Sequence, residues 1–370
     1  MKRVLVLGAG GPAGVNFIRA LRIAPEPYWI SAWDENPHHL HWPDADETYL
    51  APPAGLALAD RLAGYCDVMC IDLVVAQPDP LVKFLARFAG RLSATTCLPS
   101  EAVIDRCQSK RSSQVAWCRA GLTSGSVQIE SVELGLNLAA STFGYPYWLR
   151  AASGAGGRGS TLVEDRYQAE AWIAYWRARR CGWDFIAEEY LPGANLAFTS
   201  VWRAGELLGS YVRERLEYIY PGASPSGITG TSAVCRTVHH QAANEAAAAA
   251  VRAVDPMPNG VYCVDLKEDA GGVPRPTEIN AGRFFTICDL PAHLGANLVD
   301  LYVRAALDLE LPDVAPFDCV PAGFVWARHI DCPAVLVRED SVEQVHVEFQ
   351  NGDINAAAAR GRLAALGAGA

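Results

Sequence analysis

The stretch Thr277-Glu278-Ile279-Asn280, together with Asp265 thirteen residues before Glu278, is the part of the chain that decides its fold. Two short apolar runs, one of which holds Asp265, are joined by the turn-like segment Glu268–Pro274, and this pattern predicts a hairpin. Because alternate residues of a strand share a face, Glu278 and Asn280 point to the same side. Two carboxylates and an amide oxygen are hard ligands of the kind that Mg²⁺ prefers when it carries a nucleotide. The alternative is that these polar side chains only cover the wet face of a hairpin.

The bulk composition limits the class of protein. A chain of 370 residues exceeds what one hydrophobic core usually supports, so we expect two or three domains. Its 31 basic and 41 acidic residues give a net charge of −10, which offers no general reason to bind nucleic acid or an anionic membrane. Eleven scattered cysteines favour reduced thiols in a cytoplasmic protein. The apolar run after Met1-Lys2-Arg3 is too short for a signal peptide or a membrane span.

The first hundred residues alternate between apolar runs and amphipathic segments. A strand from Val4, a glycine-rich turn, a helix and a second strand ending at Asp34 predict a βαβ unit of a parallel sheet. Further strands are expected at Asp67–Val75 and Arg91–Cys97. We therefore predict an α/β class with an N-terminal, parallel-sheet, Rossmann-like domain over residues 1–105.

Two glycine clusters are candidate phosphate sites. The first, Gly8–Gly14, opens a helix, and Asp34 stands where a ribose partner would be in a dinucleotide-binding fold, so an NAD(P)-dependent oxidoreductase is one alternative. The glycines can equally serve only to bring the helix close to the strand. The second cluster, Ser153–Gly159, holds four glycines, which suits a loop that folds over phosphates. Lys110 and Arg150 flank it as fixed positive charges that could meet those phosphates, although a tight hairpin turn is the simpler alternative.

The second half of the chain continues with strands and helices. The alanine-rich segment Gln241–Val254 is a predicted helix, and residues 292–309 form another. Late strands are expected at Val320–Ala327 and Val342–Phe349. The tail from Asn355 to Ala370 receives no function.

These motifs together resemble those of the ATP-grasp superfamily, closest to the branch that contains carbamoyl phosphate synthase large subunits and biotin carboxylase. They occur in the family's order across roughly residues 1–310. The residues that carry the resemblance are Ser109-Lys110, Gly144 to Arg150, Gly154 to Gly159, Ala187 to Gly193, Asp265, and Glu278 to Asn280. The resemblance implies a lid subdomain over residues 106–190, a C-terminal subdomain with the metal site over 191–330, and an extension over 331–370.

The resemblance also implies a role for each matching residue. Two cations contact the ATP phosphates, a glycine loop covers them, and the adenine lies beside Glu188, with the backbone of Glu189 and Leu191 at its edge. The implied ATP-binding set is Lys110, Arg150, Gly154, Gly156, Gly157, Gly159, Glu188, Glu189, Leu191 and Asn195. The implied ligands of one or two Mg²⁺ ions, for which Mn²⁺ can substitute, are Asp265, Glu278 and Asn280.

Asn195 and Arg283 depart from the family's pattern, as does Arg150, where most relatives have lysine, and Arg213 and Arg215 are further candidate residues. Relatives often have glutamate shortly after the Pro-Gly of the hinge to contact ribose, where this chain has Asn195. Many relatives continue Asn-Pro-Arg after the metal asparagine, whereas here Arg283 is displaced by one residue. Arg213 and Arg215 share one face of a predicted strand and can bind the carboxylate substrate, or they can be solvated surface arginines. Arg283, Arg215 and Arg213 form the predicted catalytic set.

The function expected from these features is an ADP-forming ligase that makes C–N bonds. A carboxylate attacks the γ-phosphate of MgATP to give an acyl phosphate, which an amine captures. Carboxyphosphate formation from bicarbonate is an alternative, as is a nucleotide-binding protein without ligase activity. The expected partners are small-molecule carboxylate and amine substrates, and a homodimer is one expected assembly.

Overall fold

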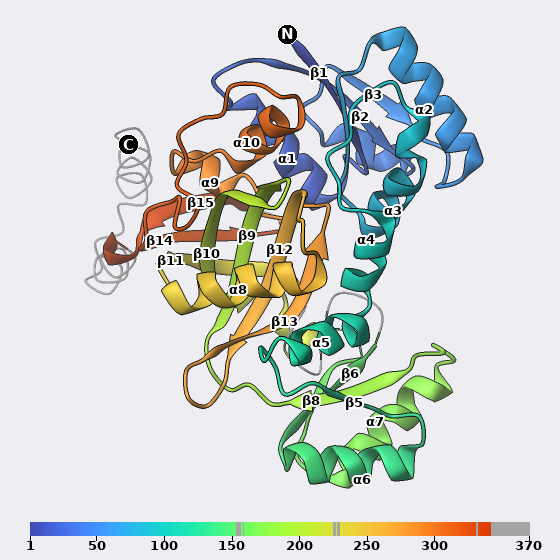
Figure 1. Ribbon diagram of the computed structural model, residues 1–370, viewed down its shortest axis with the longest axis vertical. Helices are drawn as coiled ribbons and strands as arrows, with labels where there is room; N and C mark the ends of the chain where they lie inside the picture. The colour runs from blue at the N-terminus through green and yellow to red at the C-terminus, as the bar shows by residue number, and fades with distance from the viewer. Residues whose placement is uncertain (153–156, 158, 225–226, 228–229, 331, 342–370) are drawn as a thin grey trace.

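The computed structural model describes residues 1–341 except 153–156, 158, 225–226, 228–229 and 331. The described strands form three sheets, and each sheet uses a separate stretch of the chain (Figure 1). The first sheet is parallel, and the other two are antiparallel. This arrangement confirms the predicted α/β class with an N-terminal parallel sheet followed by antiparallel sheets.

The first sheet has the strand order β3-β2-β1-β4 and carries helices on both faces. Along β1, Val4 and Val6 pack with helix α1, whereas Leu5 and Leu7 pack with α2 and α3, as the two-residue period of a strand requires. Helix α1 begins at Pro12, where the missing N–H leaves no internal bond unmade. The elements are β1 (Lys2–Leu7), α1 (Pro12–Arg22), β2 (Tyr28–Asp34), η1 (Pro37–His41), β3 (Glu47–Leu50), α2 (Leu56–Met69), β4 (Leu73–Ala76), α3 (Asp79–Phe88) and η2 (Ala89–Arg91).

Two expectations for this region were wrong in detail. The run Asp67–Val75, expected to be one strand, contains the end of α2 and most of β4, because Cys70 takes a left-handed conformation that ends the helix. Residues 91–97 form only an isolated bridge, between Thr95 and Leu73, at the free edge of the sheet. Apolar runs of this length do not by themselves separate a strand from a covered loop.

The second sheet, β5-β8-β6-β7, is antiparallel and is covered on one face by α6 and α7. On β6, Tyr147 and Leu149 enter this core, so Trp148 and Arg150 point to the opposite face. The elements from the first sheet onward are α4 (Glu101–Gln108), α5 (Lys110–Arg119), β5 (Ser126–Gln128), α6 (Val132–Phe143), β6 (Tyr147–Ala151), β7 (Thr161–Val163), α7 (Arg166–Ala178) and β8 (Phe185–Glu189).

The third sheet has seven strands in the order β13-β12-β9-β10-β11-β14-β15. The predicted hairpin is present as β12 and β13, with Asp265 directly opposite Glu278. Strand β15 pairs with β14, so the described residues just after 331 join this sheet. The elements are β9 (Asn195–Arg203), β10 (Glu206–Tyr218), η3 (Pro221–Ala223), β11 (Ser232–Val238), α8 (Gln241–Val254), β12 (Gly260–Glu268), β13 (Pro274–Ala281), α9 (Leu290–His293), α10 (Leu298–Ala306), β14 (Phe324–His329) and β15 (Cys332–Arg338).

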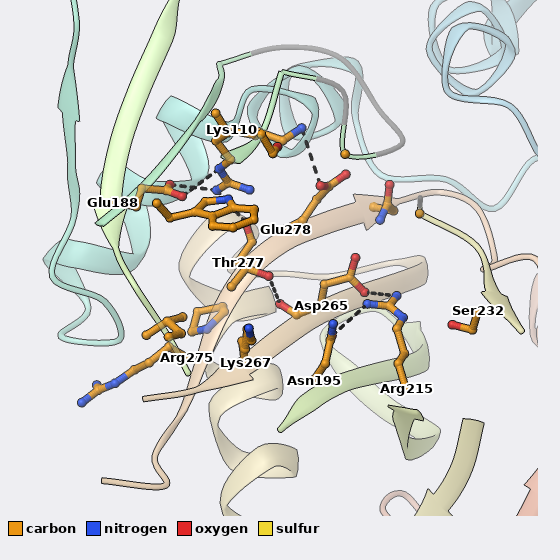
Figure 2. Close-up of a pocket in the computed structure, with 18 of the residues that line it drawn as sticks. Lys110, Glu188, Asn195, Arg215, Ser232, Asp265, Lys267, Arg275, Thr277 and Glu278 are labelled. Carbon is orange, nitrogen blue, oxygen red and sulfur yellow. Dashed lines mark hydrogen bonds and ion pairs between the residues drawn. The ribbon is translucent and has the colours of Figure 1, made fainter. Parts of the chain in front are cut away.

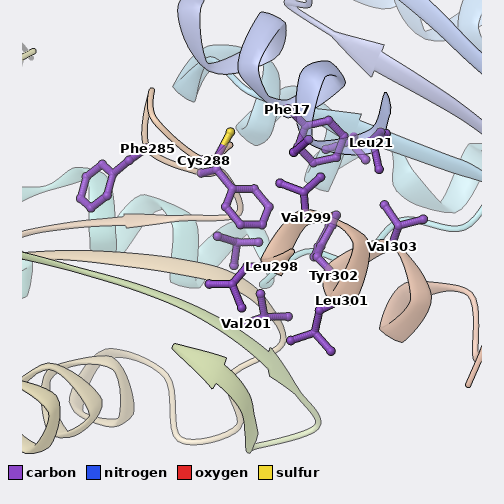
Figure 3. Close-up of a cluster of buried hydrophobic side chains, with 14 of the residues drawn as sticks. Phe17, Leu21, Val201, Phe285, Cys288, Leu298, Val299, Leu301, Tyr302 and Val303 are labelled. Atoms are coloured by element: carbon purple, nitrogen blue, oxygen red, sulfur yellow. The ribbon is translucent and has the colours of Figure 1, made fainter. Parts of the chain in front are cut away.

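The two faces of the seven-stranded sheet have different cover. The small side chains of the alanine-rich α8 pack against one face, which includes Phe198 and Val264. Part of the opposite face packs with α10 and α1, where Phe17, Phe284 and Tyr302 meet with ring centroids 5.8 to 6.4 Å apart (Figure 3). This shared core joins the first sheet to the third.

Other expectations for the second half have mixed outcomes. The helix expected over 292–309 is split into α9 and α10, and the strand expected at Val342–Phe349 lies outside the described residues, as does the tail. The division at residues 105, 190 and 330 stays a prediction. Within the described part of the chain, no helix is both long enough and apolar enough to cross a membrane.

Candidate functional site

A cavity of about 380 Å³ is lined by the second sheet, the seven-stranded sheet and α5. The second sheet contributes its uncovered face, with Trp148, Arg150 and Glu188. The seven-stranded sheet contributes the face opposite α8, with Asp265 and Glu278 (Figure 2). The sheet residues that line this cavity therefore lie on the faces opposite the helices α6, α7 and α8.

Strand register places the polar side chains of the seven-stranded sheet in rows. Glu278 is opposite Asp265, Asp265 is opposite Ala197, and Ala197 is opposite Arg213, across four neighbouring strands. Residues directly opposite one another share a face, so the carboxylates and the arginine lie on the same side of the sheet. Between them Ala197 presents only a methyl group, which leaves room above the middle of the row.

The first predicted metal ligand, Asp265, is already neutralised. Its Oδ1 accepts a hydrogen bond from Nη2 of Arg215 at 2.5 Å, and both side chains are largely buried. Burial raises the pKa of the Asp265 carboxyl, an effect that Arg215 opposes and the nearby Glu278 reinforces. Burial lowers the pKa of Arg215, but the charge and hydrogen bond of Asp265, together with Tyr218 and Glu278, outweigh it and the net shift is upward. Asp265 is therefore a carboxyl group held by a guanidinium.

The other two predicted ligands also meet cations. Glu278 lies 3.6 Å from Nζ of Lys110, and Oδ1 of Asn280 accepts a hydrogen bond of 2.5 Å from Nη2 of Arg283. Two carboxylates and an amide oxygen on adjoining strands fit a hard cation. Among the described residues no three His, Cys, Asp or Glu side chains gather as a metal site. The donors therefore fit Mg²⁺ that completes its shell with phosphate oxygens and water, rather than a cage made by protein alone.

Arg150 and Glu188 form a buried ion pair on the second sheet. Nε of Arg150 lies 2.7 Å from Oε2 of Glu188, and its Nη2 donates at 2.8 Å to Oε1. The same Nη2 donates at 2.8 Å to the backbone carbonyl of Thr277, in the hairpin of the other sheet (Figure 2). Arg150 therefore links the two walls of the cavity at the level of the predicted metal ligands. Its contact with ATP phosphates stays a prediction.

The expected adenine region lies at the end of β8. Glu189 accepts a 2.5 Å hydrogen bond from Ser124, and Leu191 lines the cavity. Nearby, Nζ of Lys267 lies 5.5 Å from the ring centre of Tyr190, and burial lowers the pKa of this lysine. A flat aromatic face beside an amine suits the base of a nucleotide.

Asn195 occupies the position where ribose recognition was in question. Its Nδ2 donates to the hydroxyl of Tyr218 at 2.6 Å, and its Oδ1 accepts from Arg215 at 3.3 Å. Asn195 therefore helps to orient the guanidinium that holds Asp265. Contact with ribose stays a prediction for this residue.

The glycine cluster is described only in part. Gly154 and Gly156 lie outside the described residues, whereas Gly157 lines the cavity. Gly159 has φ of +75°, and a Cβ there would lie 2.9 Å from the ring of Trp183. The indole N–H of Trp172 donates to the carbonyl of Gly159 at 3.0 Å. The C-terminal end of the cluster is thus fixed on Trp172 and Trp183, which pack against the core of the second sheet.

Arg283 pairs with a carboxylate at the start of α3. Its Nε and Nη2 both bind the carboxylate of Asp79 at the start of α3, with the Nη2 contact at 3.2 Å. Because Nη2 also reaches Asn280, this arginine connects the first domain to the hairpin. Its role toward an acyl phosphate stays a prediction.

Sequence reasoning missed Arg328 and Phe285, which lie at the other end of the cavity. Arg328 donates to the carbonyl of Ser232, and to the carbonyl and hydroxyl of Thr286. Phe285 lies beneath Arg213, whose guanidinium carbon is 5.1 Å from the ring centre. No local motif marks these residues, because only the pairing of β14 with β11 brings Arg328 to this face.

The first glycine cluster has a packing role. A Cβ at Gly10 would lie 2.3 Å from Cβ of His39, and one at Gly8 would lie 2.3 Å from Pro78. Asp34, the expected ribose partner, accepts a 3.0 Å hydrogen bond from the N–H of Gly10. Neighbouring chain therefore fills the space that a pyrophosphate needs in a dinucleotide-binding turn. This geometry favours the close-packing interpretation over NAD(P) binding.

Comparisons with known proteins agree with this architecture. Residues 108–181 match the family model described as Carbamoyl-phosphate synthase L chain, ATP binding domain. No curated protein sequence matches the chain significantly.

Several solved structures have the same fold. The biotin carboxylase domain of 2-oxoglutarate carboxylase from Hydrogenobacter thermophilus, a dimer in complex with MgADP, ADP and bicarbonate, is 18% identical with a TM-score of 0.66, over 88% of this chain and 73% of its own. N5-carboxyaminoimidazole synthetase from Staphylococcus aureus in complex with ADP is 15% identical with a TM-score of 0.67, over 88% of this chain and 82% of its own. The L-amino acid ligase from Bacillus licheniformis is 14% identical with a TM-score of 0.63, over 88% of this chain and 79% of its own.

The three sheets therefore have the fold of these ATP-grasp enzymes, and residues 108–181 match the ATP-binding domain of one of their families.

Proposed function

We propose that this protein is an ATP-dependent, ADP-forming carboxylate–amine ligase. The single observation that supports this proposal best is the row of donors on the seven-stranded sheet, where Asp265, Glu278 and Asn280 each face a cation in the same cavity. Such a site can exchange its internal ion pairs for Mg²⁺ and the phosphates of ATP. Bound Mg²⁺ would neutralise charge on the phosphoryl group that is transferred.

In the proposed reaction a carboxylate oxygen attacks the γ-phosphorus, and the bond to the bridging oxygen breaks to release ADP. The nitrogen of an amine then attacks the acyl carbon, loses a proton and displaces phosphate. Lys110 and Arg150 would hold the ATP phosphates, Arg283 and Arg215 would meet the developing negative charge, and Arg213 would orient the acid. These side chains position and neutralise the reactants, so the reaction needs no nucleophile from the protein.

Two related assignments stay within the same proposal. Bicarbonate is the alternative acid, which would give carboxyphosphate, and the 2-oxoglutarate carboxylase structure with MgADP and bicarbonate makes this alternative specific. That structure is also a dimer, and a homodimer stays a prediction for this chain.

The test is nucleotide binding followed by turnover. MgATP analogues that cannot be hydrolysed should raise the melting temperature in the presence of Mg²⁺, and NADH should not. Glu278→Gln removes one charge from the donor row and should lower ADP release, with an acid and amine mixture, by about 100-fold, similar to the loss of one preorganised electrostatic contact. Glu217→Gln, the same change at an exposed position of β10, is the matched control and should keep full turnover. Full turnover by Glu278→Gln would refute the metal assignment.

A further inference from the structure

The cavity holds a buried arginine that lacks hydrogen-bond acceptors among the described residues. Arg213 is 2% exposed, and its buried Nε and Nη1 have no partner in the part of the chain that the structure describes. Its guanidinium is stacked on Phe285 and contributes to the cavity wall. Buried guanidinium N–H groups without acceptors are costly, so a side chain held in this state is expected to receive an acceptor from a ligand.

Arg328 lines the same cavity and is fixed in place by neutral groups. Its hydrogen bonds among the described residues go to the carbonyl of Ser232 at 3.1 Å, and to the carbonyl and hydroxyl of Thr286 at 3.3 and 2.8 Å. These acceptors orient the guanidinium but do not neutralise it. Burial, and after it the charge of Arg213, lower the pKa of Arg328.

The carboxylates of the described residues do not neutralise the positive charges of Arg213 and Arg328. In the described part of the chain, no carboxylate oxygen lies within 4.0 Å of the guanidinium of either Arg213 or Arg328. Asp265 is held by Arg215 instead. Asp289 lies close enough to influence Arg328, but it is buried with an unpartnered Oδ1, and burial raises its pKa.

Arg328 is separated from the reacting centre, and the strand that holds Arg213 lies between them. Arg213 and Arg215 share the ring of Phe285, with guanidinium carbons 5.1 and 5.4 Å from its centre, and Arg215 binds Asp265. Arg328 comes from β14, four strands from the strand of Asp265, which corresponds to about 19 Å at the usual strand spacing. A reacting carboxylate must approach the phosphorus to about 3 to 3.5 Å, at the end where the metal donors lie. An anionic group that reaches Arg328 is therefore a different group from the carboxylate that is phosphorylated.

We propose that the acid substrate carries a second anionic group, a carboxylate or a phosphate, and that Arg213 and Arg328 bind it. This inference rests on the proposed ligase function, and it adds the substrate class: a small acid with two anionic ends. The face of Phe285 closes one side of this subsite. Two guanidinium forks can give several charge-assisted hydrogen bonds to such a group.

Binding of matched acid pairs tests the proposal. The first pair is glutarate and butyrate, and the second is phosphoglycolate and glycolate, each titrated calorimetrically at constant ionic strength with and without MgADP. We expect at least one dianion to bind about tenfold or more tightly than its monoanionic partner, because it gains charge-assisted hydrogen bonds. The pair that shows the preference distinguishes a carboxylate from a phosphate as the second group.

Variants locate the preference. Arg328→Gln and Arg213→Gln should each remove most of it, Arg328→Lys should keep part of it, and MgADP binding should be unchanged in the two Arg328 variants. Arg236→Gln is the matched control, because this arginine on β11 pairs with Glu214 and Glu339 outside the cavity. Equal binding within both acid pairs, or a preference that survives both glutamine variants, would show the proposal to be wrong. Failure of the unmodified protein to bind MgADP would instead refute the proposed function. The two failures can be told apart, because the preference for the dianion is also measured without nucleotide.

Discussion

The buried pair of Arg150 and Glu188 allows a prediction whose size follows from the structure. Both residues are less than 10% exposed, and Arg150 has three close acceptor contacts, two of them with Glu188. Replacing Glu188 by leucine removes two of the three and leaves a buried cation with one carbonyl, that of Thr277. Breaking a buried ion pair by removing one partner costs about 3 to 5 kcal/mol, so we expect a loss of this size in the free energy of unfolding.

The double variant separates this coupling from the loss of packing. Arg150→Met combined with Glu188→Leu removes both charges, so it should cost less than the sum of the two single variants, and it can be close to neutral. Urea unfolding followed by tryptophan fluorescence and by circular dichroism gives the four free energies, and agreement of the two signals checks that the transition is cooperative. If the costs of the single variants add within about 0.5 kcal/mol, the pair is not coupled and the reasoning fails.

Two further predictions use other parts of the fold. Brief treatment of the native protein with a thiol reagent, followed by peptide mapping, should find Cys70 and Cys118 labelled, because both are exposed. Cys263 should stay unlabelled, because burial raises its pKa to about 12. Early labelling of Cys263 would contradict the described core. Gly10→Ala should lower the melting temperature, because the new methyl group would meet Cβ and the backbone oxygen of His39 at 2.3 and 2.5 Å, and it should leave MgADP affinity unchanged; a selective loss of nucleotide binding would favour a phosphate site in the first glycine cluster.

Local sequence patterns correctly predicted the elements whose formation depends on residues close together in the chain. The period-two pattern around Asp265 and Glu278 predicted the hairpin, and the pairing of β12 with β13 confirms it. The alanine-rich helix was predicted with its observed bounds, because a good helix former fills every turn of it. Isolated apolar runs such as Arg91–Cys97 were not sufficient to predict a strand, because strand formation there depends on a pairing partner that the local sequence does not specify.

The sequence by itself determined the α/β class, the hairpin and the order of the polar motifs, because these follow from local periodicity and turn chemistry. Only the tertiary structure decided which charges meet. The pairing of β12 and β10 with β9 brought Asp265 within reach of Arg215, docking of the first domain placed Asp79 against Arg283, and the pairing of β14 with β11 brought Arg328 into the same cavity as Arg213. Each of these contacts joins residues far apart in the chain. The free energy that selects them comes from burial of whole faces of sheets and helices, which no short motif encodes.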